Sequence, residues 1–209
     1  MVLPLRNAIC RLVSCPDVWW DPEATRIMDW KFERLGRLAA TTSKPRFVVA
    51  YFMAPHEPYV YRADCSHATV REAWPKPEQQ RAAYLAQIEC VNRKLLTAID
   101  GILRDSQEPP VILIQSDHGH GHLTKEYMEL EEASPAMVRA RLDIFSAYRV
   151  PGSPDTLFYD GMTPVNLLPR VFNYVFGTAL PSLPNRSIWA VKNTPYRLTA
   201  IPPDAIGGP

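Results

Sequence analysis

Little glycine, few cysteines and almost no excess charge characterise this sequence, and each shortage excludes a class of protein. Nine glycines among 209 residues lie below the ordinary share of about 7%, and 46% of the residues are hydrophobic, so the chain is neither fibrous nor disordered. The formal net charge is +1, whereas nucleic-acid-binding proteins concentrate Lys and Arg into a strongly basic face. We therefore expect no nucleic-acid partner.

Long apolar runs and paired cysteine motifs are absent as well. No stretch of about 18 or more apolar residues occurs, and residues 1–6 lack the apolar core of a signal peptide. As written, the chain is expected neither to cross a membrane nor to be exported, which leaves the cytoplasm as the default location. The four cysteines form no C-x-x-C pair, so we predict reduced thiols, with a Cys10–Cys15 disulfide as the alternative.

Proline is the residue in excess, and the length predicts one domain. The 21 prolines are about twice the ordinary share of ~5%, so many segments between secondary-structure elements have restricted backbone freedom. A chain of this length buries roughly 70% of its unfolded surface, so a metal site would serve function rather than folding. We expect a single, partial domain over residues 1–201 and a flexible tail over residues 202–209.

The hydrophobic pattern predicts an α/β fold. The apolar, β-branched run at residues 47–53 is typical of a strand buried on both faces. A long helix follows from Glu78 to Arg104, with Gln87 outside its apolar stripe, and residues 111–115 form a second apolar run. Strand, helix and strand in this order predict a parallel βαβ unit. Three further elements are expected: a helix over 21–40, a strand over 142–148 and a helix over 164–176 with Val165, Leu168, Val171, Phe172 and Val175 inward.

Histidines follow both predicted strands at their carboxyl ends, where open α/β sheets bind ligands. His56 lies between Pro55 and Pro58, which limit the backbone freedom around it. Asp117 and His118 follow the second strand, and a carboxylate beside an imidazole suits Zn²⁺ or Mn²⁺ better than Ca²⁺ or Mg²⁺. The alternatives are a solvated histidine loop after the second strand and a rigid turn, hydrogen-bonded to backbone, at His56.

Taken in order, the motifs resemble the C-terminal half of sulfatase-like proteins of the alkaline phosphatase superfamily. The resemblance extends from about residue 28 to about residue 197. It rests on these segments: Phe47–Tyr59, Tyr84–Leu96, Pro110–Gly119, Ala147–Gly152, Pro164–Asn166, Asn173–Gly177 and Leu183–Ser187.

The resemblance implies a three-layer α/β/α sandwich with a mostly parallel sheet, incomplete at its N-terminus. It implies a divalent-metal-dependent hydrolase or transferase acting on small-molecule, lipid or glycan esters of sulfate or phosphate. Asp117 and His118 match the family's metal ligands, and His56 matches a histidine that contacts the anionic group of the substrate. His120 is a further candidate for substrate binding, and the family pattern assigns no role to His122.

The sequence departs from the family pattern at the nucleophile. Such enzymes carry a Thr, a Ser or a Cys matured to formylglycine in an N-terminal half, together with another metal carboxylate. The segment around Cys15 and Pro16 does not fit the Cys-x-Pro-x-Arg maturation pattern. Two alternatives therefore stay open beside the enzyme: a non-catalytic module that binds metal or anions, and a helical interaction protein that uses the long helix.

Overall fold

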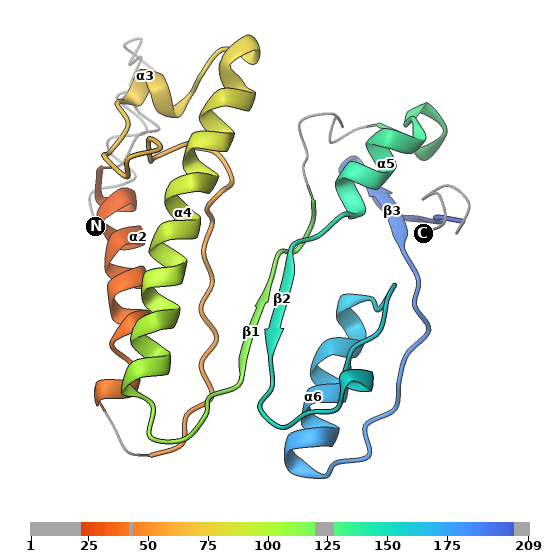
Figure 1. The fold of residues 1–209 in the computed structure, drawn as a ribbon. Coiled ribbons are helices and arrows are strands. Elements are labelled where there is room, and N and C mark those ends of the chain that lie inside the picture. The colour runs from red at the N-terminus through yellow and green to blue at the C-terminus, as the bar shows by residue number, and fades with distance from the viewer. Residues whose placement is uncertain (1–21, 42–43, 120–127, 203–209) are drawn as a thin grey trace, which may run out of the picture. The chain divides into compact units, whose positions relative to one another are not determined.

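The computed structural model describes residues 22–41, 44–119 and 128–202. The chain forms two compact units, residues 1–109 and residues 110–209; Figure 1 draws both, and each is described by itself. The expected tail at 202–209, apart from Pro202, and the alternative Cys10–Cys15 pair lie outside the described residues, as do His120 and His122. No helix within the described ranges is long and apolar enough to span a membrane.

Two helices form the framework of the first unit. Helix α2 covers Pro22–Gly36 and helix α4 covers Pro77–Asp105, so both helices predicted from periodicity are confirmed. They lie side by side (Figure 1) and approach closely at Gly36, because a Cβ atom at Gly101 would come within 2.5 Å of the Gly36 carbonyl oxygen. Glycine at this crossing lets the two backbones touch.

A disulfide joins α4 to the loop before it, so the prediction of reduced thiols is wrong for Cys65 and Cys90. Their Cα atoms lie 5.0 Å apart, within the range that disulfides require, and Cys90 is fully buried among Val60 and Tyr61. The cysteines are separated by 25 positions in the sequence, which matches no spacing motif, and this is why sequence inspection missed the pair. Closing this loop restricts the unfolded chain and so favours the folded unit.

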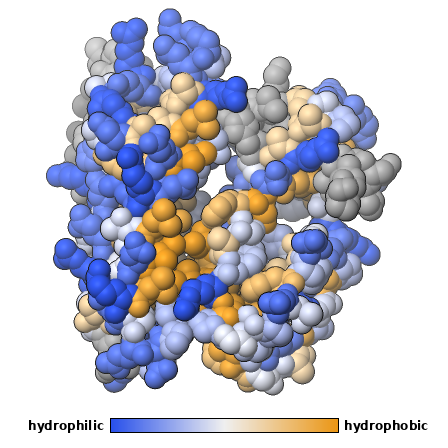
Figure 2. All heavy atoms as spheres, viewed as in Figure 1, coloured by the Kyte–Doolittle hydropathy of each residue, from blue (hydrophilic) through white to orange (hydrophobic). Residues whose placement is uncertain are grey.

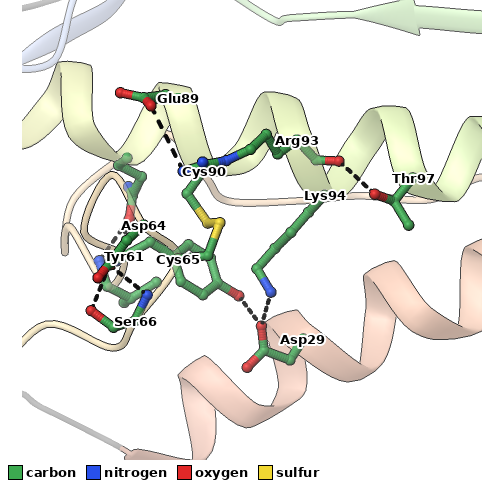
Figure 3. The surroundings of a disulfide bond; sticks show 12 residues. Asp29, Tyr61, Asp64, Cys65, Ser66, Glu89, Cys90, Arg93, Lys94 and Thr97 are labelled. Atoms are coloured by element: carbon green, nitrogen blue, oxygen red, sulfur yellow. Dashed lines mark hydrogen bonds and ion pairs between the residues drawn. A yellow bond between two sulfur atoms is a disulfide. The ribbon is translucent and has the colours of Figure 1, made fainter.

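The carboxylate of Asp29 lies beside the disulfide and binds three donor groups, two of which, on Tyr61 and Lys94, are labelled in Figure 3. Tyr61 Oη lies 2.7 Å from Oδ1, Lys94 Nζ lies 2.8 Å from Oδ1, and His67 Nε2 lies 2.8 Å from Oδ2. Burial of the Asp29 carboxyl opposes ionisation, but these donors prevail and its pKa lies below the ordinary value. The cluster therefore connects α2, α4 and the disulfide loop through one charge.

The apolar segment 47–53 is not a strand, so the prediction of a doubly buried strand is wrong. Only Phe52 packs inward, with its ring 4.4 Å from that of Phe32, while Phe47 and Val49 are 70% and 81% exposed. No strand among the described residues pairs with the segment, and an apolar run without a partner strand forms no ladder. Figure 2 shows hydrophobic side chains on the surface where this segment runs along the first unit.

The described residues of the second unit form two small antiparallel sheets. Strand β1, Ile112–Gln115, pairs with β2, Ser146–Arg149, and strand β3, Ile188–Val191, pairs with β4, Thr194–Ala200. A strand after α4 is therefore confirmed, but its neighbour runs antiparallel to it. The predicted strand over 142–148 begins late, because Leu142 ends helix α5, Pro135–Leu142. A mostly parallel three-layer sandwich is not confirmed.

Short helices and two apolar clusters complete this unit. Helix α6, Leu167–Phe176, follows a turn of 3-10 helix at Pro164–Asn166, as the apolar spacing predicts. Val171 packs inward beside Leu157 and Leu167, but Val165, Leu168 and Val175 are exposed, so the predicted inward face is wrong at these three positions. The remaining elements are α3 at Val70–Ala73 and 3-10 turns at Ala39–Thr41, Leu130–Glu132 and Asp155–Leu157.

Candidate functional site

His56 lies in a turn directly after the extended segment of the first unit. Its backbone N–H donates to the Met53 carbonyl at 2.8 Å, and its ring Nδ1 lies 2.7 Å from the Glu57 carbonyl oxygen. That contact requires the proton on Nδ1, which in the neutral imidazole leaves Nε2 with a free lone pair. The side chain is exposed, so Nε2 is accessible to a ligand.

Gln87 on α4 holds this turn in place, although sequence periodicity assigned it to the polar side of the helix. Its side chain is fully buried. The amide Nε2 donates to the His56 carbonyl at 3.0 Å, and Oε1 accepts the backbone N–H groups of Val60 at 2.6 Å and Tyr61 at 3.3 Å. A buried amide whose groups are paired in this way fixes the backbone that it contacts.

Asp117 and His118 follow β1 in the second unit, as the sequence predicts. Asp117 Oδ2 lies 3.8 Å from His118 Nε2, and the two side chains are 80% and 35% exposed. Both groups are therefore open to solvent and to a cation. Two ligands of one tetrahedral Zn²⁺, each bound at about 2.0–2.2 Å, stand roughly 3.4 Å apart, so the observed separation lies a few tenths of an ångström above the value that a shared metal requires.

The tautomer of His118 decides whether it can bind a metal. Nδ1 lies 2.7 Å from the Gly119 carbonyl oxygen and 2.9 Å from Arg141 Nη1. In one protonation state Nδ1 cannot both donate a hydrogen bond to the carbonyl oxygen and accept one from the guanidinium. When Nδ1 is protonated and bonded to the carbonyl, Nε2 keeps its lone pair for a metal, because metal-binding histidines usually donate their other ring N–H to a carbonyl or carboxylate oxygen.

The loop that carries this pair is fixed to the end of α5. The Gly119 N–H donates to the Arg141 carbonyl at 2.8 Å, and the Phe145 N–H donates to Ser116 Oγ at 2.9 Å. A Cβ atom at Gly119 would overlap the Ala140 carbonyl oxygen, so glycine is required by close approach. Sequence inspection assigned no task to Arg141, and no sequence signal places this arginine beside His118.

The described part of the chain brings Asp117 and His118 together but supplies no third ligand. No group of three or more His, Cys, Asp or Glu side chains suited to a metal occurs there. His56 belongs to the first unit and the Asp117–His118 pair to the second. The substrate-binding role of His120 stays a prediction, because His120 lies outside the described residues, as does His122.

Comparison with known proteins agrees with the residue pattern. The family model for the sulfatases matches residues 16–171, about three quarters of the chain. This chain belongs to the sulfatase family, whose members act on sulfate esters and generally use a divalent metal, and whose fold is of the α/β class. No curated protein and no solved structure gave a significant match.

Proposed function

We propose that this chain supplies the metal ligands and a substrate contact of a metal-dependent hydrolase or transferase for sulfate or phosphate esters. The observation that carries the proposal is the Asp117–His118 pair, whose two ligand atoms lie 3.8 Å apart at the end of β1. Family membership supports it independently, because the matched range includes both residues and also His56.

Asp117 and His118 are proposed to hold the cation. A carboxylate oxygen beside an imidazole nitrogen favours Zn²⁺ or Mn²⁺ over Ca²⁺ or Mg²⁺. When bound, such a metal would stabilise negative charge on the oxygens of the transferred group. The Gly119 carbonyl would keep the His118 proton on Nδ1, and Arg141 would compete for that nitrogen in the metal-free protein.

His56 is proposed to contact the anionic group of the substrate. With Nδ1 bonded to the Glu57 carbonyl, protonation at Nε2 turns the ring into a cationic donor that faces solvent. Gln87 would position His56 through its carbonyl rather than touch the substrate. His120 is a second proposed substrate contact, and no residue of this chain is assigned as the nucleophile.

The substrates proposed are small-molecule, lipid or glycan esters of sulfate or phosphate.

Metal titration tests the ligand assignment directly. Calorimetric titration with Zn²⁺ should show binding to the unaltered chain and a loss of at least roughly tenfold in affinity for Asp117→Ala and for His118→Ala, since even outer-shell changes cost 10–100-fold. His67→Ala is the matched control, because His67 also lies beside an aspartate, at 2.8 Å. Equal affinity in all four proteins would overturn the assignment.

Turnover separates the enzyme from a module that only binds metal or anions. Hydrolysis of 4-nitrophenyl sulfate and 4-nitrophenyl phosphate should be measured with Zn²⁺ and Mn²⁺, and His56→Ala should lower any rate without changing Zn²⁺ affinity. Metal binding with no turnover of either ester would reject catalysis by this chain and favour the non-catalytic module.

A further inference from the structure

The second unit contains a cavity whose lining residues include neither Asp117 nor His118. It measures about 500 Å³, within the range of roughly 300–1,000 Å³ that is common for small-molecule sites. The lining combines Gly161, Thr163, Asn185, Arg186 and Ser187 with an apolar wall formed by residues 200–202. Among the described residues the lining includes one arginine and no acidic residue, so these residues give the cavity a net positive charge.

Buried amides order the loop that brings Arg186 to the cavity. Asn166 is fully buried, and its side chain bonds both backbone groups of Leu183, at 2.8 Å through Oδ1 and 2.9 Å through Nδ2. The same Nδ2 donates to Asn185 Oδ1 at 2.9 Å, and Thr163 donates to that oxygen through its hydroxyl at 2.8 Å. An otherwise irregular loop is thus fixed on both sides of Pro184, which preorganises its side chains.

Two residues of the lining have polar side chains that remain available for a ligand. The Ser187 carbonyl accepts the Ile201 N–H at 2.9 Å, but neither the Ser187 hydroxyl nor the Arg186 guanidinium has a hydrogen-bond or ion-pair partner among residues 22–41, 44–119 and 128–202. Thr163 differs, because its hydroxyl hydrogen is already donated to Asn185. The side chains of Arg186 and Ser187 are therefore the hydrogen-bond donors available to a ligand.

We propose that this cavity binds a small organic oxyanion, with Arg186 and Ser187 on the anionic group and the apolar wall against the body of the molecule. A planar guanidinium pairs with two oxygens of a sulfate, phosphate or carboxylate, and a hydroxyl donates to a third or bridges the same group. The wall at residues 200–202 favours an organic anion over the inorganic ion. The site is independent of the Asp117–His118 pair.

Titration observed by NMR tests the site with 4-nitrophenyl sulfate, inorganic sulfate and neutral 4-nitrophenol as probes. The ester should shift the amide signals of Ser187 and Gly161 and bind more tightly than either fragment. Arg186→Met should weaken it by roughly tenfold or more, as expected for a charge-assisted pair. Arg139→Met is the matched control, since Arg139 is an exposed arginine of the same unit that does not line the cavity.

The site is distinguished from metal-dependent binding by adding a chelator and by using Asp117→Ala. Ester binding that survives both changes, and is lost in Arg186→Met alone, supports the proposal. Three results would overturn it: equal affinity in the two arginine variants, shifts confined to residues outside the cavity, or equal binding of the ester and neutral 4-nitrophenol.

Discussion

Replacing Gln87 by leucine should destabilise the first unit and loosen the turn that carries His56. The change keeps the side-chain size but removes the acceptor for the Val60 and Tyr61 N–H groups, at 2.6 and 3.3 Å, and the donor to the His56 carbonyl at 3.0 Å. Val60 and Tyr61 are 4% and 2% exposed, so water cannot readily replace the lost acceptor.

The magnitude follows from those three groups. An unpaired buried N–H costs about 1–3 kcal/mol, and the short bond to Val60 carries most of the effect. The exposed turn at His56 lets water reach its carbonyl, so we expect a loss of roughly 2–4 kcal/mol in the free energy of unfolding. Urea denaturation measures this as a lower midpoint at unchanged slope.

Two comparisons make the experiment decisive. Gln79→Leu is the matched control, because Gln79 is an exposed glutamine on the same helix, and it should change stability little. Amide exchange at Val60 should accelerate in Gln87→Leu only. An unchanged urea midpoint, or unchanged exchange at Val60, would refute the reasoning that Gln87 fixes this turn.

Three further predictions concern two glycines at close backbone contacts and one surface ion pair. Gly101→Ala should lower stability by about 1–3 kcal/mol in urea titrations, because its methyl group meets the Gly36 carbonyl; wild-type stability would contradict that crossing. Gly119→Ala should similarly destabilise the second unit and weaken Zn²⁺ binding in calorimetry, and full retention of both would contradict the packing. The Arg62 guanidinium, with help from the N-terminus of α3, lowers the pKa of Glu72 from 4.5 to about 2. The pair therefore contributes stability above about pH 4.5 that is lost as pH falls toward 2. Arg62→Met should raise the Glu72 pKa in an NMR titration, and an unmoved pKa would disprove the pairing.

Helices were predictable from this sequence because their pattern is local. The three-and-four spacing of apolar residues along 78–104 is sufficient to indicate α4, whose observed bounds are Pro77–Asp105. The run at 111–115 likewise predicts β1. Segment 47–53 carries an equally strong strand pattern, but a strand also needs a neighbour, and pairing depends on residues remote in the sequence.

The residues of the candidate site were likewise predictable only where the sequence signal is local. Asp117 and His118 were found because they are adjacent in sequence, directly after an apolar run. Gln87 was missed because periodicity treats a polar residue as outward, whereas its burial depends on backbone groups some 30 residues away. The Cys65–Cys90 pair was missed for the same reason, since no local spacing marks a bond between a loop and a helix.

The central claim is that Asp117 and His118 together hold a divalent metal ion. Mn²⁺ tests it directly, because this paramagnetic ion broadens the NMR signals of nuclei close to it. With Mn²⁺ bound, the ring signals of His118 should broaden, and the broadening should disappear in Asp117→Ala. A sharp, unchanged His118 signal, or equal broadening in Asp117→Ala, would contradict the account.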